Sequence, residues 1–225
     1  MKTVSIHQAQ YIPWPPYIKK IFQSDVFVIM DNVQFQKNGV QNRNRLRTKK
    51  EAFWLTIPVS GSMTDSILEK QIVDRRWPQK HWRSLQANYA SAPYWDRYSQ
   101  DLEYLYKQEY QSLFEVNLTF TLFILEHLDI DTEIVTLSSL SLNQKKSDLV
   151  LEACSVLGAD VYLSGLGSKT YLNEDAFTKR GIEIRYLAST PPFYNQVCEP
   201  FIEGLSMLDM MFYVPPHEIL AYLKE

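Results

Sequence analysis

The sequence predicts an α/β fold: a mainly parallel, Rossmann-like sheet with a β-hairpin excursion and a helical insertion. Short apolar runs alternate with amphipathic segments in the last third of the chain, an order typical of parallel strands joined by helices. The N-terminal segment has the same order, and a hairpin-like stretch and a helical stretch separate the two. The 225 residues fit a single domain, 1–225, in which about 75–130 form a helical insertion or cap.

The N-terminal segment is expected to supply two strands of the sheet. Residues 4–8 form a short apolar run that ends in polar side chains, and residues 26–30 are five apolar residues in succession. Both patterns indicate strands buried in a parallel sheet. Residues 17–23 predict one or two helical turns after three prolines. Residues 31–50 are polar and basic, residues 53–59 alternate, and together they are expected to form the hairpin.

The middle of the chain has helical periodicity. Two sets of apolar residues recur at the spacing of one helix face: Trp95, Tyr98, Leu102 and Leu105, and then Leu113, Val116, Phe120, Phe123 and Leu125. Each set predicts a helix with an aromatic or aliphatic buried side. These helices are the expected insertion or cap.

The last third of the chain predicts two crossovers of a parallel sheet. Strands are expected at 133–137, 160–164 and 182–186. Ser147 is the candidate N-cap of a helix that stops at Gly158, and Asn173 can cap a second helix that stops at Gly181. Residues 165–172 form the loop between the second strand and the second helix. The resulting connections are expected to be right-handed.

Composition excludes several classes of protein. Seven glycines, a low share, exclude collagen-like repeats and a glycine-cradled phosphate site of the usual kind. The two cysteines, Cys154 and Cys198, can supply neither a zinc cluster nor a disulfide framework. No run approaches the roughly 18 apolar residues of a membrane span, and the N-terminus lacks the apolar core of a signal peptide. We therefore expect a cytoplasmic protein without membrane insertion.

Positive charge is concentrated near the N-terminus. Residues 1–50 carry nine Lys/Arg against two Asp/Glu, a net charge of +7, which leaves −10 for the rest of the chain. Residues 34–45 alone hold six Asn/Gln, two Arg and one Lys, all directional donors for phosphate, carboxylate or sugar hydroxyls. The pattern favours a local anionic ligand. The alternative is a solvated loop whose amide residues simply favour turns.

Ligands of open parallel sheets bind beyond the carboxyl ends of the strands, and this rule selects the candidate site. His7, at the end of the first strand, is the candidate general base, and Asp31, at the end of the second, is its candidate catalytic partner. The alternative for His7 is a hydrogen-bonded core histidine. The candidate substrate-binding residues are Gln8, Gln10, Tyr11, Trp14, Tyr17, Gln34, Lys37, Asn42, Arg43, Asn44, Arg45, His81, Ser164, Gly165, Gly167 and Tyr171. The histidines are widely separated, so no metal site is predicted.

A set of motifs spread over nearly the whole chain resembles the WbqC-like protein family. The N-terminal part of the match comprises His7-Gln8, Tyr11-Ile-Pro-Trp14, Tyr17, Lys20-Ile21, Asp25, Phe27-Val28, Asp31, Val33-Gln-Phe35, Lys37, Asn42-Arg-Asn-Arg45 and Trp54-Leu-Thr-Ile-Pro-Val59. The later part comprises Lys80-His81, Ala92-Pro-Tyr94, Ser138-Ser139, Gly158-Ala-Asp-Val-Tyr-Leu-Ser-Gly165, Gly167, Tyr171-Leu172, Glu174, Phe177, Tyr194, Gln196, Leu205-Ser206 and Asp209. One departure is that a His-Pro pair often seen before Tyr194 is absent here.

The resemblance implies a role in bacterial surface polysaccharide (O-antigen) biosynthesis. The implied reaction transfers glycine or another aminoacyl or acyl group to the amine of a nucleotide-linked amino sugar. The activated acyl donor stays open among a thioester, an aminoacyl-tRNA and an adenylate made in place, and neither a cofactor nor an oligomeric state is indicated. Two other classes also stay open: a non-catalytic protein that binds a glycan or a nucleotide sugar, and an assembly protein without a small-molecule site.

Overall fold

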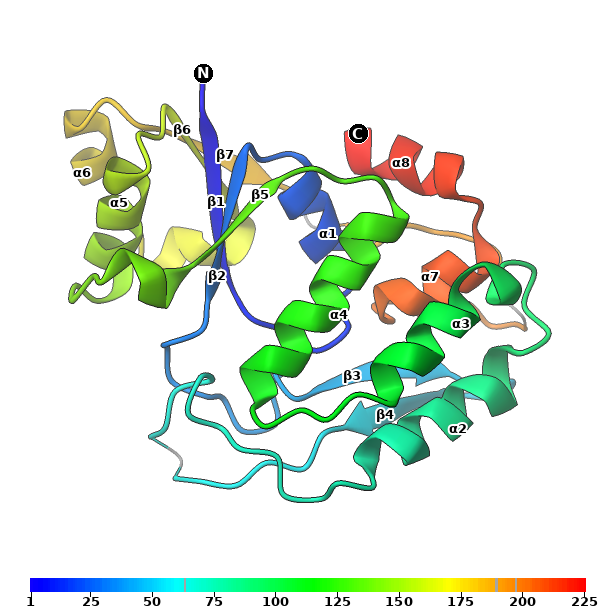
Figure 1. Cartoon of the computed structure of the whole chain (residues 1–225). Coiled ribbons are helices and arrows are strands. Elements are labelled where there is room, and N and C mark those ends of the chain that lie inside the picture. Colours follow the sequence, from blue (N-terminus) through cyan, green and yellow to red (C-terminus); the bar gives the residue numbers. More distant parts are fainter. Residues whose placement is uncertain (63, 189, 197) are drawn as a thin grey trace.

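The fold is built around a five-stranded, fully parallel sheet in the order β5-β2-β1-β6-β7 (Figure 1). The computed structural model describes residues 1–62, 64–188, 190–196 and 198–225. The strands are β1 (Thr3–Gln8), β2 (Val26–Met30), β5 (Glu133–Thr136), β6 (Val161–Gly165) and β7 (Glu183–Leu187). The expected α/β fold with a mainly parallel sheet is confirmed.

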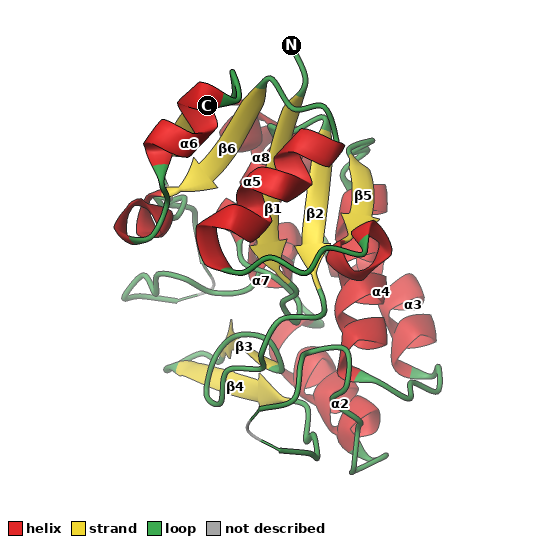
Figure 2. Cartoon of the chain, turned by 90° about the vertical axis from the view of Figure 1, so that its left-hand side faces the viewer, coloured by secondary structure: helices red, strands yellow, loops and turns green. Residues whose placement is uncertain are grey.

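Helices cover both faces of this sheet (Figures 1 and 2). One face carries α1 (Pro15–Phe22), α4 (Leu113–His127), α7 (Met207–Tyr213) and α8 (Pro216–Lys224), and the other carries α5 (Lys146–Val156) and α6 (Glu174–Lys179). Phe27 and Ile29 of β2 pack into the larger core on the α1 side, whereas Val26 and Val28 pack into the smaller core on the α5 side. Both faces of β2 are buried, which explains its unbroken apolar sequence.

The predicted hairpin is also present. Strands β3 (Arg43–Arg47) and β4 (Ala52–Thr56) pair in antiparallel register, with Arg45 opposite Trp54. The hairpin lies beyond the carboxyl ends of β1 and β2 (Figure 2). It therefore borders the edge of the sheet at which a ligand of this kind of fold binds.

The helical stretch between the hairpin and β5 contains α2 (Trp77–Tyr89), α3 (Trp95–Tyr106) and α4. The periodicity of α4 is as predicted, but on α3 the fourth buried residue is Tyr106, because Leu105 stays partly exposed. Aromatic rings fill the core here: Phe120 of α4 lies 4.9 Å from Tyr106 and 5.6 Å from Tyr11 between ring centroids.

The crossover helices follow the predicted caps with one correction. The Asn173 side chain caps α6, and Gly158 and Gly181 end α5 and α6 with φ values of +65° and +71°. Ser147 is not the N-cap of α5, because Lys145 occupies that position. The Ser147 side chain is buried within the first turn, where its Oγ accepts a hydrogen bond from the Asn173 N–H at 2.9 Å.

The chain reverses its direction across the sheet between β1 and β6. It runs outward from β1 through β2 to β5, returns through α5 to β6 on the other side of β1, and continues to β7. The pairing of β1 with β2 extends to Gln8 opposite Met30, whereas the described pairing of β1 with β6 ends at Ser5 opposite Leu163. The two strands at the switch point therefore separate toward their carboxyl ends, where such sheets bind ligands.

Candidate functional site

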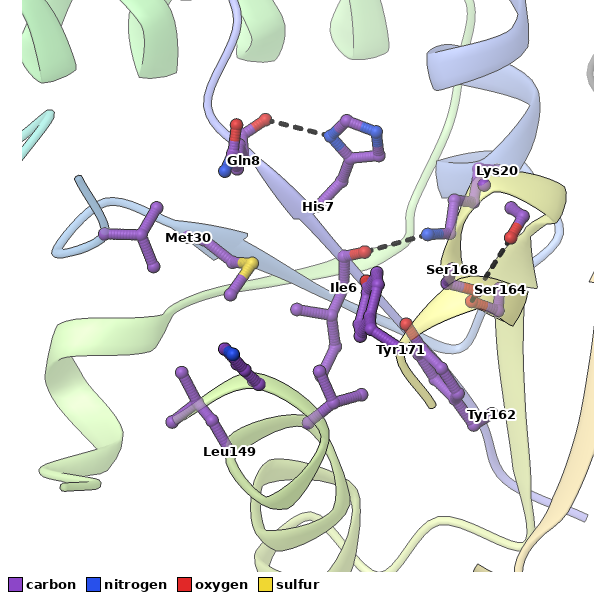
Figure 3. Close-up of a pocket in the computed structure, with 15 residues that line it drawn as sticks. Ile6, His7, Gln8, Lys20, Met30, Leu149, Tyr162, Ser164, Ser168 and Tyr171 are labelled. Carbon is purple, nitrogen blue, oxygen red and sulfur yellow. Dashed lines mark hydrogen bonds between the residues drawn. The ribbon is translucent and has the colours of Figure 1, made fainter. Parts of the chain in front are cut away.

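A cavity of about 590 Å³ lies at this switch point, and we call it the switch-point cavity. Strands β1, β2 and β6, helices α1 and α5, and the 3₁₀ turn η2 (Leu166–Thr170) contribute to its walls (Figure 3). Its lining residues are Ile6, His7, Gln8, Lys20, Met30, Val33, Lys146, Leu149, Val150, Tyr162, Ser164, Gly165, Gly167, Ser168 and Tyr171. The lining combines an aliphatic floor with a few polar groups, as in small-molecule sites.

His7 enters the cavity as a neutral imidazole. Its ring stands edge-on to Tyr17 at 5.1 Å, and its Nδ1 lies 3.2 Å from the Gln8 carbonyl. A carbonyl can only accept, so Nδ1 carries the proton and Nε2 keeps its lone pair. Burial and the nearby Lys20 lower the His7 pKa to about 4. At pH 7 the ring is therefore a hydrogen-bond acceptor but a weak base.

Lys20 lines this cavity but is not among the candidate site residues from the sequence, although Lys20-Ile21 is one of the motifs of the family resemblance. Its side chain is 5% exposed and donates a hydrogen bond from Nζ to the Ile6 carbonyl at 2.8 Å (Figure 3). Burial lowers its pKa to about 7. One signal was available: Lys20 follows Tyr17 by three residues and so shares its inward helix face.

The wall contributed by β6 and η2 is made of small residues. Ser164 and Ser168 exchange a hydrogen bond at 2.5 Å, and the Ser168 hydroxyl also reaches the Gly165 carbonyl at 2.8 Å. A Cβ atom at Gly165 or Gly167 would meet no atom within 4 Å. Glycine is therefore not required there by packing, and this side of the cavity is open to a ligand. Half-exposed Tyr171 follows η2 and lines the same wall.

A second cavity, of about 370 Å³, lies between the hairpin and the loops before and after it, and we call it the hairpin cavity. It includes the predicted residues Lys37, Asn42 and Arg43, and also Lys70, which sequence reasoning missed. Arg43 stacks its guanidinium 4.2 Å from the centre of the Trp54 ring. Lys70 is 3% exposed, and its Nζ reaches Ser62 O at 2.5 Å and Asp65 Oδ2 at 3.4 Å.

The two cavities are linked by a pair of glutamines. Gln8 lines the switch-point cavity, and its Oε1 accepts a hydrogen bond from Gln41 Nε2 at 2.9 Å. Gln41 is buried, and the next residue, Asn42, lines the hairpin cavity. Polar side chains therefore run from the partly apolar switch-point cavity toward the hairpin cavity, whose lining includes Lys37, Arg43 and Lys70.

Asp31 lines neither cavity. Its side chain is buried, and Oδ1 accepts hydrogen bonds from the backbone N–H groups of Asn32 and Ser138, both at 2.9 Å. Oδ2 accepts from the Ser138 hydroxyl at 2.5 Å. These contacts fasten the 3₁₀ turn η1 (Leu137–Leu140) to the end of β2. The geometry gives Asp31 a positioning role for this turn, and its catalytic role stays a prediction without support from these contacts.

The remaining predicted substrate-binding residues line neither cavity either. Trp14 precedes α1, Tyr17 packs behind His7, and Gln34 is exposed with a bridge to Ser66. Asn44 donates from Nδ2 to the backbone oxygens of Tyr11 and Ile12, and Arg45 donates to Glu203 O at 2.8 Å. Gln10, Tyr11 and His81 are buried. Sequence proximity to the strand ends does not reveal which of these side chains turn into the core.

Tyr11 and His81 belong to a buried hydrogen-bond chain. His81 Nε2 lies 3.2 Å from the Thr56 carbonyl and therefore carries the proton, which leaves Nδ1 to accept from the Tyr11 hydroxyl at 2.9 Å. Tyr11 in turn meets the Tyr106 hydroxyl at 2.7 Å. All three rings are buried, so this chain joins the loop after β1 to α2, α3 and the hairpin.

This chain predicts a pH dependence of stability. Burial lowers the His81 pKa from 6.5 to about 4, so the unfolded state binds a proton that the folded state resists. The contribution of neutral His81 to the free energy of unfolding is fully present above pH 6.5 and is lost as the pH falls toward 4. We expect His81 alone to lower the free energy of unfolding by about 2 kcal/mol between pH 7 and pH 5.

The measurement is urea unfolding of the wild type and His81→Gln at both pH values. The glutamine variant should lose less stability than the wild type over this interval, because its side chain does not titrate. Equal losses in the two proteins would contradict the prediction, since other groups would then account for the whole effect.

Within the described part of the chain, no group of three or more His, Cys, Asp or Glu side chains is placed to hold a metal ion. Over the same residues, no helix has the length and apolar content needed to cross a bilayer.

The fold and the site together define a doubly wound α/β protein with a small-molecule cavity at its switch point. The chain belongs to the WbqC-like protein family, whose model matches residues 8–221. The uncharacterized protein Rv1507c of Mycobacterium tuberculosis is 30% identical over 218 residues, which cover 95% of this chain and 94% of that protein. No solved structure matches the chain.

Proposed function

We propose that this protein is a transferase that acylates the amine of a nucleotide-linked amino sugar in the biosynthesis of a bacterial surface polysaccharide (O-antigen). The observation that carries the proposal is the switch-point cavity, where His7 and Gln8 of β1 face the Ser164–Gly165 wall of β6. The cavity suits a sugar, since aliphatic floor atoms and neutral polar groups match a ring that has both. The transferred group is glycine or another aminoacyl or acyl group.

The adjoining hairpin cavity supports the nucleotide part of this proposal. Lys37, on a loop, and Arg43, on β3, supply positive charge there, and Lys70 lines the same cavity but is paired with Asp65. Arginine and amide donors suit the diphosphate of a nucleotide sugar. The Gln8–Gln41 pair would then lie beneath the junction between the diphosphate and the sugar.

The reaction forms a C–N bond between the sugar amine and an activated acyl carbon, the bond from that carbon to its leaving group breaks, and the nitrogen loses one proton to the departing group or to solvent. The neutral His7 Nε2 can accept a hydrogen bond from the attacking amine and orient its lone pair toward the carbonyl. The donor must carry a good leaving group, as a thioester, an aminoacyl-tRNA or an adenylate does. The turnover assay described below distinguishes the three donor types.

The test is a calorimetric titration of the protein with UDP-glucosamine and, as the matched ligand without an amine, UDP-glucose. We expect UDP-glucosamine to bind more tightly. At Gly165 an added Cβ would meet no atom within 4 Å, so the variant Gly165→Leu should fill the open wall and weaken binding at least tenfold while Tm stays unchanged. Gln86→Leu, at an exposed position of α2 outside both cavities, is the control and should bind like the wild type.

Turnover decides between the two functional classes. The wild type should convert UDP-glucosamine to an amide with one of the three donor types, detected by mass spectrometry, and His7→Ala should lose most of this rate while it retains ligand affinity. If the protein binds the nucleotide sugar but forms no amide with any donor, it is a binding protein rather than a transferase. If no nucleotide sugar binds, the proposal is wrong.

A further inference from the structure

The amine of Lys20 lies in the gap where β1 and β6 separate. Backbone pairing between these strands stops at Ser5 and Leu163, although β6 remains paired with β7 as far as Gly165. The Ile6 carbonyl, just beyond the last described pair, accepts a hydrogen bond from Lys20 Nζ at 2.8 Å. The lysine reaches this carbonyl from α1 and lines the switch-point cavity (Figure 3).

Beyond the Ile6 carbonyl and the ring of Tyr162, the surroundings of this amine offer little to stabilise a positive charge. Its side chain is 5% exposed, and among the described residues no carboxylate lies within 4.0 Å of Nζ. The titratable groups that face it are His7 from β1, Cys154 from α5 and Tyr162 from β6, whose ring centre is 6.0 Å away. Burial raises the Cys154 pKa to about 12, so the thiol is neutral, and the Tyr162 phenol is kept neutral by the same cause.

These observations place an amine that loses its charge near neutral pH at the wall of a ligand cavity. A buried lysine without a counter-ion favours its neutral form, because desolvation penalises the ammonium. Such an amine keeps a lone pair that can take up a proton. General bases act best when their pKa lies near the working pH, and burial lowers the Lys20 pKa to about 7.

We propose that Lys20 is the proton acceptor of the switch-point cavity and deprotonates the ammonium group of the acceptor amino sugar. The inference rests on the proposed function and adds a catalytic residue to it. In this step the N–H bond of the sugar ammonium breaks, its electron pair stays on the sugar nitrogen, and the proton binds Lys20 Nζ. The products are a neutral, nucleophilic sugar amine and a lysine ammonium.

His7 and Lys20 are suited to different roles in this step. His7 lines the cavity and its Nε2 is unprotonated, but the ring has little proton affinity, so it is suited to orient the amine after deprotonation. Lys20 holds the proton. The resulting ammonium keeps the Ile6 carbonyl as an acceptor, so the charged state formed during the reaction has a partner in place.

The chain offers a matched control in the preceding residue. Lys19 is also on α1 and also buried, but its Nζ lies 4.7 Å over the ring of Tyr222 on α8, away from the cavity. Lys19→Met and Lys20→Met remove the same group from neighbouring positions of one helix. A difference in rate between the two variants would therefore reflect the position of Lys20 in the cavity rather than the loss of a buried lysine.

The first measurement is a pH titration of the free protein with ¹⁵N-labelled lysine side chains, observed by NMR. The Lys20 signal is assigned by its loss in Lys20→Met. We expect its midpoint within about one unit of pH 7. A midpoint above 9 would overturn the proposal, whatever the protein binds, because the lysine would then be charged at neutral pH.

The second measurement is the pH profile of amide formation from UDP-glucosamine. The wild-type rate should rise with increasing pH, and the midpoint of this rise should match the midpoint of the NMR titration. Lys20→Met should lower the rate by about 10²-fold or more. Lys19→Met should stay within about twofold of the wild type. In Lys20→Ala, added ethylamine should restore part of the rate. The restored rate should depend on the pKa of the added amine, because repair of packing alone would not create such a dependence.

The two proposals can fail separately. If the protein acylates UDP-glucosamine but Lys20→Met keeps the wild-type rate and pH profile, the transferase stands and the role of Lys20 is wrong. If Lys20 titrates near pH 7 but no nucleotide amino sugar binds, the proposed function is wrong. In that case a sugar ammonium is not the group that Lys20 deprotonates. If Lys20→Met does not fold, Lys20→Arg tests the same point, because its guanidinium stays charged.

Discussion

Replacement of Asp209 with alanine is expected to lower the free energy of unfolding by about 3–5 kcal/mol. The Asp209 carboxylate is fully buried in α7 and accepts hydrogen bonds from the hydroxyls of Tyr89 at 2.6 Å and Tyr194 at 2.7 Å. Alanine would leave both phenols without an acceptor in a site that water does not reach. An unsatisfied buried donor costs the full desolvation of that group.

The effect of this substitution extends beyond the two tyrosines. The Tyr89 hydroxyl also accepts the backbone N–H of Arg47 at 2.8 Å, and the buried Arg47 guanidinium donates to Gln196, Cys198 and Pro200. Asp209 and Arg47 thus hold the segment after β7 against the hairpin. We therefore expect Asp209→Ala to increase the rate of proteolysis within 190–206 as well.

Urea unfolding and limited proteolysis measure the two effects. Asp209→Asn is the matched control: it keeps an acceptor oxygen and the side-chain volume, so it should cost less than the alanine variant. The prediction is wrong if alanine and asparagine destabilise the protein equally, or if Asp209→Ala costs less than about 1 kcal/mol.

Replacement of Phe120 with alanine should also cost about 3–5 kcal/mol. The ring is completely buried and lies within 4.9 Å of Tyr106, 5.6 Å of Tyr11 and 6.5 Å of Tyr110 between centroids. Alanine would leave a void the size of the ring among side chains that are themselves held by hydrogen bonds. Tyr11 and Tyr106 are fixed through His81, so they cannot collapse into the void without breaking the chain.

The matched control is Leu122→Ala, two residues away on α4, where the side chain is 43% exposed. Both variants remove an apolar side chain from the same helix, so helix propensity contributes little to the difference between them. Thermal and urea unfolding should show the Phe120 variant destabilised by several times more than the Leu122 variant. Similar losses for the two would mean that the void closes and that the aromatic core is adaptable.

The sequence predicted the fold because local signals there agreed with the tertiary structure. The five apolar residues 26–30 could be satisfied only by a strand covered on both faces, and helices on both faces do cover it. Gly158 and Gly181 adopt the positive φ that ends helices. Ser147 shows where such a signal fails: serine is a good N-cap, but here its hydroxyl bonds the N–H of a residue in a different element.

The candidate site was predicted in part. The rule for parallel sheets placed His7, Gln8, Ser164 and Gly165 at one edge, and all four line the switch-point cavity. Asp31 obeys the same rule, yet its oxygens turn to the backbone of the neighbouring turn rather than to the cavity. The ends of strands can be located from sequence, whereas the direction of a side chain beyond the end depends on partners distant in the chain.

The sequence by itself determined the parallel sheet, the hairpin and the buried helix faces, since each depends on periodicity or turn residues within a short window. Only the tertiary structure decided which polar residues face the cavity. Lys20 is the clearest case. In the sequence it is one of two adjacent lysines on a short helix, and its environment arises because β1 and β6, more than 150 residues apart, separate beside it.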